Sequence, residues 1–257
     1  MSVNPMKKTV CTLLLLSFFL STSFSANFYN FYSKKFISDE RLEYILKDVS
    51  LLTLGSLGNL SLIIDVGKYV GAHVKNQGYA YYIMGPIDSL SIDDEDYFYR
   101  VNKSPFITAD VYEKFATGLS IAGVIPVFDG RGKIDTNLVS SLITRKLTYP
   151  VIVESSGKAN LLRNLGYTGV FILETSDGYE FLNGRYTPLY WSISLPNGES
   201  IRRNVLLNSI IYISQGDIKI KKPFSNNGIV VFSDEEFVIE EAKKILGKKA
   251  GPGRIPW

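Results

Sequence analysis

The spacing of apolar residues changes repeatedly along this chain, and this feature limits the possible folds more than any other. From residue 60 onward the pattern alternates between a helical and an extended period, which is typical of βα units. A helical face over residues 62–74, for example, precedes an extended, aromatic-rich run over residues 79–84. Strands joined through helices pair in parallel with right-handed crossovers. The sequence therefore predicts an α/β protein with parallel strands.

Further helices and strands follow the first pair. Thr108 is predicted to cap a helix that ends at Gly123. The later elements expected from the pattern are strands over residues 124–128, 151–153, 169–173 and 229–232, and helices over residues 137–146, 158–165 and 233–246, the last opened by a capping box of Ser233 and Glu236.

The segment from residue 177 to residue 222 is less regular. Its turn Pro196-Asn197-Gly198 is predicted to head a hairpin. Residues 204–214 fit either a helix or a strand, and the pattern leaves both open.

The first 25 or so residues have the three-part layout of a secretion signal. Lys7 and Lys8 precede an apolar run over residues 10–20, and small residues follow at Ser23 and Ser25. The alternative is a membrane anchor, but the run is about half of the roughly 20 residues that a spanning helix needs. We therefore expect cleavage, a secreted or periplasmic mature protein, and no membrane span after cleavage.

The length of the mature chain limits the architecture further. A closed (β/α)8 barrel typically takes about 250 residues, which is more than remains after the signal. We expect a truncated or partly open TIM-type (β/α) barrel with parallel strands. The expected organisation is a signal peptide over residues 1–25, a single α/β barrel-like domain over residues 26–250, and a flexible tail over residues 251–257.

Composition excludes several classes of function. The single cysteine, Cys11, lies inside the signal, so the mature chain has no disulfide, thiolate metal site or cysteine nucleophile. The single histidine, His73, argues against histidine metal clusters and serine–histidine triads. Without Lys7 and Lys8, 26 basic residues face 25 acidic ones, which gives no electrostatic support for nucleic-acid binding. We expect no cofactor.

An acidic residue follows closely on each of four predicted strands. The carboxyl ends of parallel strands share one rim, where such folds bind ligands and carry out chemistry. Paired carboxylates on a rim are what glycoside cleavage needs. Any one of these residues taken singly is better explained as a helix cap or a solvated loop residue, but the four together favour a site. They are Asp88, Asp129, Glu154 and Glu174.

A succession of short motifs carries a more specific signal. Gly85-Pro86-Ile87-Asp88 is similar to a Gly-Pro-Val-x-Asp region, and residues 162–170 are similar to Leu-Arg-x-x-x-Gly-Phe-x-Gly-Val with one residue fewer. Residues 102–124 between them also keep the expected order of motifs. Over residues 53–175 the chain thus resembles the N-terminal domain of glycoside hydrolase family 3. The resemblance implies a barrel, carbohydrate as the partner, and Glu174 at the position of the nucleophilic aspartate.

The chain departs from the family at the residues that handle the sugar. The family's Lys-His-Phe-Pro-Gly-His-Gly segment corresponds to residues 126–132, which lack the lysine and both histidines. The stretch that carries the acid/base histidine in some members corresponds to Asp135-Thr136-Asn137. The family's sugar-contacting arginine corresponds to Lys103, or to Arg100 if the loop shifts. The first strand or two of the barrel are predicted to be missing.

Three hypotheses remain open from the sequence. The first is a retaining glycoside hydrolase with Glu174 as nucleophile and Asp129 or Glu154 as proton donor. The second is a non-catalytic module at the cell envelope that binds a sugar or a protein partner. The third is a purely structural domain. The residues expected to contact a substrate or ligand are Asp88, Lys103, Arg131 and Asp135.

Overall fold

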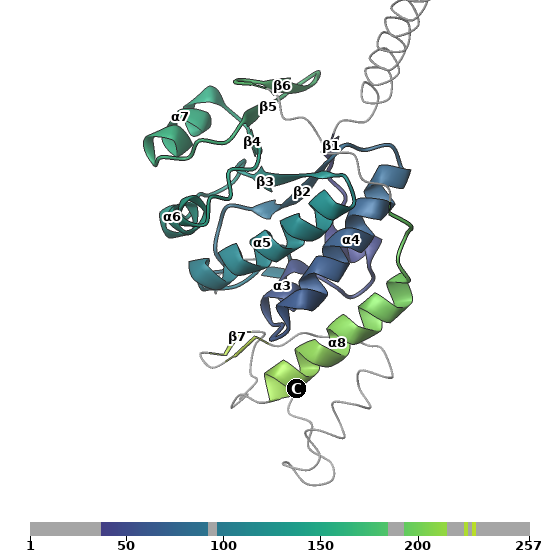
Figure 1. Ribbon diagram of the computed structural model, residues 1–257. Coiled ribbons are helices and arrows are strands. Elements are labelled where there is room, and N and C mark those ends of the chain that lie inside the picture. Colours follow the sequence, from purple (N-terminus) through teal and green to yellow (C-terminus); the bar gives the residue numbers. More distant parts are fainter. Residues whose placement is uncertain (1–36, 92–96, 185–192, 215–223, 226–227, 230–257) are drawn as a thin grey trace, which may run out of the picture.

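The computed structural model describes residues 37–91, 97–184, 193–214, 224–225 and 228–229 (Figure 1). The expected signal peptide, the expected tail over residues 251–257 and the expected helix over residues 233–246 lie outside the described residues. So does the strand expected over residues 229–232, apart from Ile229. Within the described part of the chain, no helix is both long enough and apolar enough to cross a membrane.

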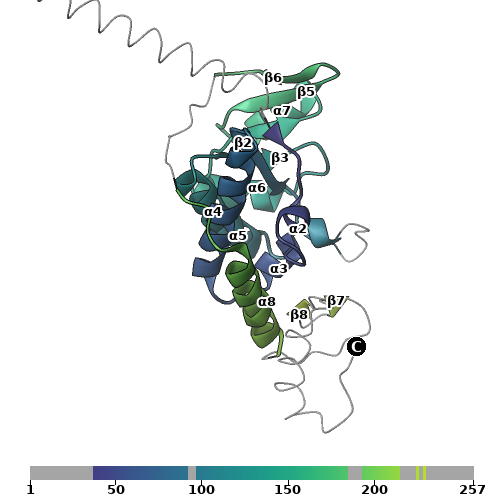
Figure 2. The same ribbon diagram turned by 90° about the vertical axis from the view of Figure 1, so that its right-hand side faces the viewer.

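A curled six-stranded sheet forms the centre of the protein, and its strands follow one another in chain order (Figures 1 and 2). The first five strands pair in parallel, and the sixth returns antiparallel to the fifth. The predicted fold class, a partly open TIM-type barrel, is confirmed. The strands are β1 (Ile37–Ser38), β2 (Tyr81–Pro86), β3 (Ile125–Asp129), β4 (Val151–Val153), β5 (Phe171–Thr175) and β6 (Gly178–Phe181).

The helices lie on the outer face of this sheet. α4 and α5 run side by side, and α8 packs against α3 and α4 (Figure 1). The helices are α2 (Leu42–Ile45), α3 (Leu51–Gly55), α4 (Leu60–Asn76), α5 (Pro105–Ile121), α6 (Thr136–Thr144), α7 (Ser156–Asn164), α8 (Gly198–Ser214) and the 3₁₀ turn η1 (Tyr97–Tyr99), and a separate pair of short strands is formed by β7 (Phe224–Ser225) and β8 (Gly228–Ile229).

Alternate strand residues build two separate apolar clusters. The outer cluster joins the sheet to the helices through large side chains such as Tyr112, Phe115 and Phe128. The inner cluster consists of side chains from the strands and their ends, including Ile125 and Val127 of β3. Because successive side chains of a strand point to opposite faces, continuous apolar strands fill both clusters. The inside of the partial barrel is therefore packed, as in a closed barrel.

Two glycines set the close approach of α4 and α5. A Cβ atom on Gly118 would lie 2.2 Å from the carbonyl oxygen of Ile64 and 2.7 Å from the Cα atom of Gly67. These distances are shorter than any van der Waals contact allows, so only glycine fits at this crossing. The two glycines therefore let α4 and α5 pack with their backbones in contact.

Side-chain caps begin the helices that follow the strands, and one of them corrects an expectation. The Ser104 hydroxyl accepts from the N–H of Ile107 at 3.4 Å, and Pro105 takes the first helical position. The prediction that Thr108 caps α5 is therefore wrong. Its hydroxyl lies inside the helix and donates to the carbonyl of Asn102 at 3.3 Å.

Two further expectations are corrected. Residues 198–214 form α8, whose first turn is capped by the Asn197 side chain through the N–H of Ser200 at 3.0 Å. The hairpin prediction is therefore wrong, and the helical alternative for residues 204–214 is confirmed. The early barrel strand is not wholly missing either, because β1 pairs in parallel with β2 at the edge of the sheet.

Candidate functional site

The four acidic residues predicted after strands lie at one end of the sheet. Asp129 is the last residue of β3, Glu154 follows β4 directly, and Glu174 is the last residue but one of β5. Asp88 lies two residues beyond β2. Because these strands are parallel, their carboxyl ends form one rim. The structure thus places all four residues at the same end of the sheet, and their roles stay predictions.

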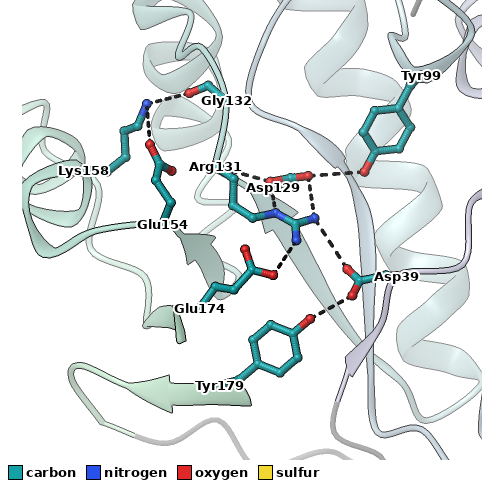
Figure 3. A network of polar contacts seen from close by, with 9 residues as sticks. All are labelled: Asp39, Tyr99, Asp129, Arg131, Gly132, Glu154, Lys158, Glu174 and Tyr179. Atoms are coloured by element: carbon teal, nitrogen blue, oxygen red, sulfur yellow. Dashed lines mark hydrogen bonds and ion pairs between the residues drawn. The ribbon is translucent and has the colours of Figure 1, made fainter. Parts of the chain in front are cut away.

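Arg131 lies at the centre of this rim (Figure 3). Its Nε donates to Oδ1 of Asp129 at 2.9 Å, and its Nη2 donates to Oδ2 of the same carboxylate at 3.0 Å. Its Nη1 donates to Oε1 of Glu174 at 3.0 Å, and Nη2 also lies 3.5 Å from Oδ1 of Asp39. One guanidinium thus joins the ends of β1, β3 and β5.

Asp129 is the most enclosed carboxylate of this network. Besides the two guanidinium contacts, its Oδ1 accepts from the backbone N–H of Arg131 at 3.0 Å. Its Oδ2 accepts from the hydroxyl of Tyr99 at 3.4 Å. A bidentate pair with arginine is among the strongest charge-assisted hydrogen bonds. Both oxygens of Asp129 therefore act as acceptors, which is the opposite of the role of a proton donor.

Two side chains of this network keep their protons far into the alkaline range. Burial raises the pKa of the Tyr99 hydroxyl above its ordinary value of 10.0, and the charge of Asp129 adds to the shift. The hydrogen bond with Asp129 raises the pKa of the Arg131 guanidinium, followed by the charges of Asp129, Glu174 and Asp39. Tyr99 therefore stays a donor, and Arg131 stays a cation.

Asp39 and Tyr179 close the gap between the two edges of the sheet. The Tyr179 hydroxyl donates to Oδ2 of Asp39 at 2.8 Å, so the end of β1 is tied to β6 (Figure 3). The rings of Tyr81 and Phe181 meet across the same gap, with 6.2 Å between their centroids. Burial, followed by the hydrogen bond to Asp39, raises the pKa of Tyr179.

Sequence reasoning missed Asp39, Tyr99 and Tyr179. Asp39 carries the same signal as the other four acids, since it directly follows a strand. That strand has only two residues, which is too short for a period to be seen. Tyr179 lies opposite Glu174 in the β5–β6 pairing, and the hairpin that places it there was not predicted.

Glu154 has a different partner from Glu174. Its Oε1 lies 3.1 Å from Nζ of Lys158, one helical turn further on in α7. The same Nζ donates to the carbonyl of Gly132 at 2.6 Å. Lys158 therefore connects Glu154 to the loop that carries Arg131 (Figure 3).

Asp88, which is itself buried, forms a separate ion pair beside this network. Oδ2 of Asp88 lies 3.6 Å from Nε of Arg100. Arg100 also lies beside Tyr99, since its guanidinium is 6.0 Å from the centre of the Tyr99 ring, and the guanidinium of Arg41 is 4.5 Å from the same ring. Cations over an aromatic face are attracted by its quadrupole. Tyr99 therefore links the Asp88 pair to the Arg131 network.

The remaining two predicted residues are placed differently. Asp135 caps α6, with Oδ1 accepting from the N–H groups of Asn137 at 2.8 Å and Leu138 at 3.3 Å. Lys103 is exposed in the loop before α5. The substrate contacts expected of both residues stay predictions. In the part of the chain that the structure describes, no group of three or more potential ligands is arranged to hold a metal ion.

Comparisons with known proteins add only distant similarity. No family model matches the chain, and no curated protein matches it. The chain is similar to the structure of LpqI from M tuberculosis, at 18% identity and a TM-score of 0.40, over 68% of this chain and 60% of that one. It is similar to a glycosyl hydrolase of the GH3 family from Mycobacterium smegmatis, at 17% identity and a TM-score of 0.40, over 64% and 61%. The chain thus spans less than two thirds of the length of either structure.

Proposed function

We propose that this domain binds carbohydrate at the rim formed by Asp129, Arg131 and Glu174 without cleaving it, as a non-catalytic relative of glycoside hydrolase family 3 at the cell envelope. The succession of family-like motifs over residues 53–175 supports the relationship. The rim also offers the chemistry that sugars need, because its carboxylates accept hydrogen bonds from hydroxyl groups. The half-buried ring of Tyr179 supplies apolar surface beside them.

The observation that carries the proposal is the position of Arg131. Retaining cleavage needs one carboxylate free to attack the sugar and a second carboxyl group that gives up a proton. Here a single guanidinium binds both Asp129 and Glu174. The cation neutralises the nucleophile, and Asp129 receives hydrogen bonds on both of its oxygens.

Retaining hydrolysis is the second candidate, and one observation favours it. The Glu174 side chain is 39% exposed, and only its Oε1 is engaged by Arg131. A glutamate at this place can reach a bound sugar with its other oxygen. Glu154 would then act as the proton donor after release from Lys158, because both oxygens of Asp129 accept hydrogen bonds from Arg131 and Tyr99.

Export belongs to the same proposal, since a glycan-binding rim is useful where glycans are exposed. We propose that residues 1–25 are removed and that the mature protein is secreted or periplasmic. Expression of the whole chain in a host with a secretory pathway, followed by mass determination of the recovered protein, is expected to give a start at Ala26 or Asn27. A protein that keeps Met1 in the cytosol would contradict the proposal.

The two candidates are separated by measuring binding and turnover on the same protein. Oligosaccharides of glucose, xylose and N-acetylglucosamine are titrated by calorimetry, and the corresponding aryl glycosides are assayed for release of the aryl group. We expect saturable binding of one sugar and no turnover. Turnover that Glu174→Gln abolishes would establish the hydrolase instead.

Glu180→Gln is the matched control for Glu174→Gln. Glu180 lies on β6 in the same hairpin, paired opposite Leu173, so its side chain points to the other face of the sheet from Tyr179 and Glu174. Binding is expected to change in Glu174→Gln and to stay unchanged in Glu180→Gln. Equal effects would show that the rim is not the binding site.

A further inference from the structure

We propose that in the free protein the Arg131 side chain occupies the place on the rim where a sugar binds. A sugar reaches Asp129 and Glu174 only when this side chain rotates out. The inference rests on the proposed carbohydrate function, and it adds how access to the site is controlled. We call the space between the carboxylates of Asp39, Asp129 and Glu174 the rim socket.

The guanidinium fits the rim socket in the way that a bound ligand would. It is planar, and each of its three nitrogens donates to a carboxylate: Nε and Nη2 to Asp129, Nη1 to Glu174, with Nη2 also 3.5 Å from Asp39. These carboxylate oxygens are the same acceptors that sugar hydroxyls would use. A sugar and the guanidinium therefore compete for them, and in the sugar complex the hydroxyl groups occupy the carboxylate oxygens that Arg131 occupies in its absence, so neither carboxylate becomes free to act as a nucleophile.

The backbone on both sides of Arg131 is held in place. The N–H of Gly130 donates to the carbonyl of Ile152 at 2.8 Å, and a Cβ atom there would lie 2.7 Å from Cγ1 of Val151. On the other side, Lys158 holds the carbonyl of Gly132 at 2.6 Å. Opening of the rim socket is thus a matter of side-chain rotation and needs no movement of the loop.

The exposure of Arg131 gives its side chain a route out. The side chain is 27% exposed, so it reaches solvent without parting the apolar clusters. Rotation of an exposed side chain takes place on a picosecond to nanosecond scale, and the ion pairs slow it further. The cost of leaving is the loss of the contacts with Asp129 and Glu174, which a ligand with several hydroxyl donors offsets in part.

The charge of the rim socket explains why it needs an occupant. Three carboxylates meet at one guanidinium, so an empty socket would bring negative charges together without a shared cation. Arg131 satisfies them in the absence of ligand. Replacing Arg131 by alanine therefore has two consequences: the socket becomes open, and it becomes a receptor for a small guanidinium ion.

The direction in which sugar affinity changes in Arg131→Ala shows whether Arg131 competes with the sugar or helps to bind it. If Arg131 occupies the place of the sugar, Arg131→Ala binds the sugar more tightly than the natural protein, roughly tenfold by calorimetry. If Arg131 is itself a sugar-binding residue, the same change weakens binding. Unchanged or weaker sugar binding overturns the inference.

Methylguanidinium provides a second readout that needs no sugar. At millimolar concentration it is expected to raise the Tm of Arg131→Ala, to leave the Tm of the natural protein unchanged, and to compete with the sugar in the variant only. If Arg131→Ala does not fold by itself, recovery of folding with methylguanidinium is the same test. An alanine variant on which methylguanidinium has no effect contradicts the rim socket. Arg163→Ala is the control, because it removes a guanidinium of α7 that bonds to Asn160 at 2.9 Å and lies outside the rim socket.

The two proposals fail in different ways. If methylguanidinium binds Arg131→Ala but no sugar binds either protein, the rim socket stands as a self-occupied site and the carbohydrate function fails. If the natural protein binds a sugar and Arg131→Ala binds it less well, the carbohydrate function stands and the role of Arg131 as an occupant fails.

Discussion

Arg131 and Arg202 are both held by carboxylates, yet they have different surroundings. Arg202 of α8 is only 5% exposed, and its Nη2 and Nη1 bind Asp48 and Glu199 at 2.8 Å each. Its Nε donates to the carbonyl of Lys47 at 2.9 Å. The two acids come from the adjoining loop and from the helix itself. Arg202 fastens α8 to the rest of the domain.

Arg131 differs in charge balance and in location. It faces three carboxylates rather than two, it is 27% exposed, and it lies where parallel strands end. A buried arginine with matched partners stabilises a particular packing of helices. A partly exposed arginine with an excess of acidic partners forms an arrangement that a ligand can compete with. An arginine thus stabilises helix packing at position 202 and, as we propose, controls ligand access at position 131.

The largest expected effect tests Arg202. Arg202→Met should lower the free energy of unfolding by about 3 kcal/mol, because the buried guanidinium is lost from the α8 contact and Asp48, whose side chain is only 20% exposed, loses a charged donor. Urea denaturation followed by circular dichroism measures the change. Arg203→Met, on the exposed neighbour, is the control and should cost under about 0.5 kcal/mol. Equal losses in both variants would remove the distinction between the two arginines.

The next effect concerns the enclosed carboxylate at Arg131. Asp129→Asn should lower the free energy of unfolding by about 1–3 kcal/mol, since the amide presents a donor where Arg131 or Tyr99 also donates. The measurement is again urea denaturation. If Asp129→Asn lowered the free energy of unfolding as much as Arg202→Met does, the contacts of the rim would serve mainly to stabilise the fold.

A smaller effect is expected at the exposed end of the same network. Glu174→Gln should cost less than about 1 kcal/mol, because an ion pair with an exposed partner contributes little. Glu180→Gln again serves as the control. The ratio of the stability losses in Asp129→Asn and Glu174→Gln therefore compares the contributions of these two partners of Arg131. A greater loss at Glu174 would contradict the contacts described above.

The smallest effect is a change with pH. Burial raises the folded-state pKa of Tyr99 above the value of 10.0 that applies when it is unfolded. The protonated hydroxyl therefore contributes stability that is complete below pH 10.0 and is lost as the pH rises toward the folded pKa.

Unfolding in urea at about pH 8 and about pH 10.5 measures this loss, and Tyr99→Phe should lose less stability over that interval, by about 0.8 kcal/mol. An identical loss in the natural protein and the variant would show that Tyr99 does not titrate differently on folding.

The candidate site was only partly visible in the sequence. Asp129, Glu154 and Glu174 were found because each follows a recognisable strand, and a parallel sheet gathers such residues at one end. Their partners were not found. Neither the bond from Arg131 to Glu174 nor that of Lys158 to the Gly132 carbonyl follows from spacing, because residues in loops have no period that fixes where their side chains point.

The sequence by itself determined the alternation of helices and strands, since apolar spacing and helix caps act over a few residues. It also determined the acidic rim, since every parallel strand ends on the same side. Only the tertiary structure decided which charges meet there. Asp39 is 92 positions from Arg131 and 140 from Tyr179, and the curl of the sheet brings the three together. Pairing over such distances depends on how the whole barrel closes, which no local pattern encodes.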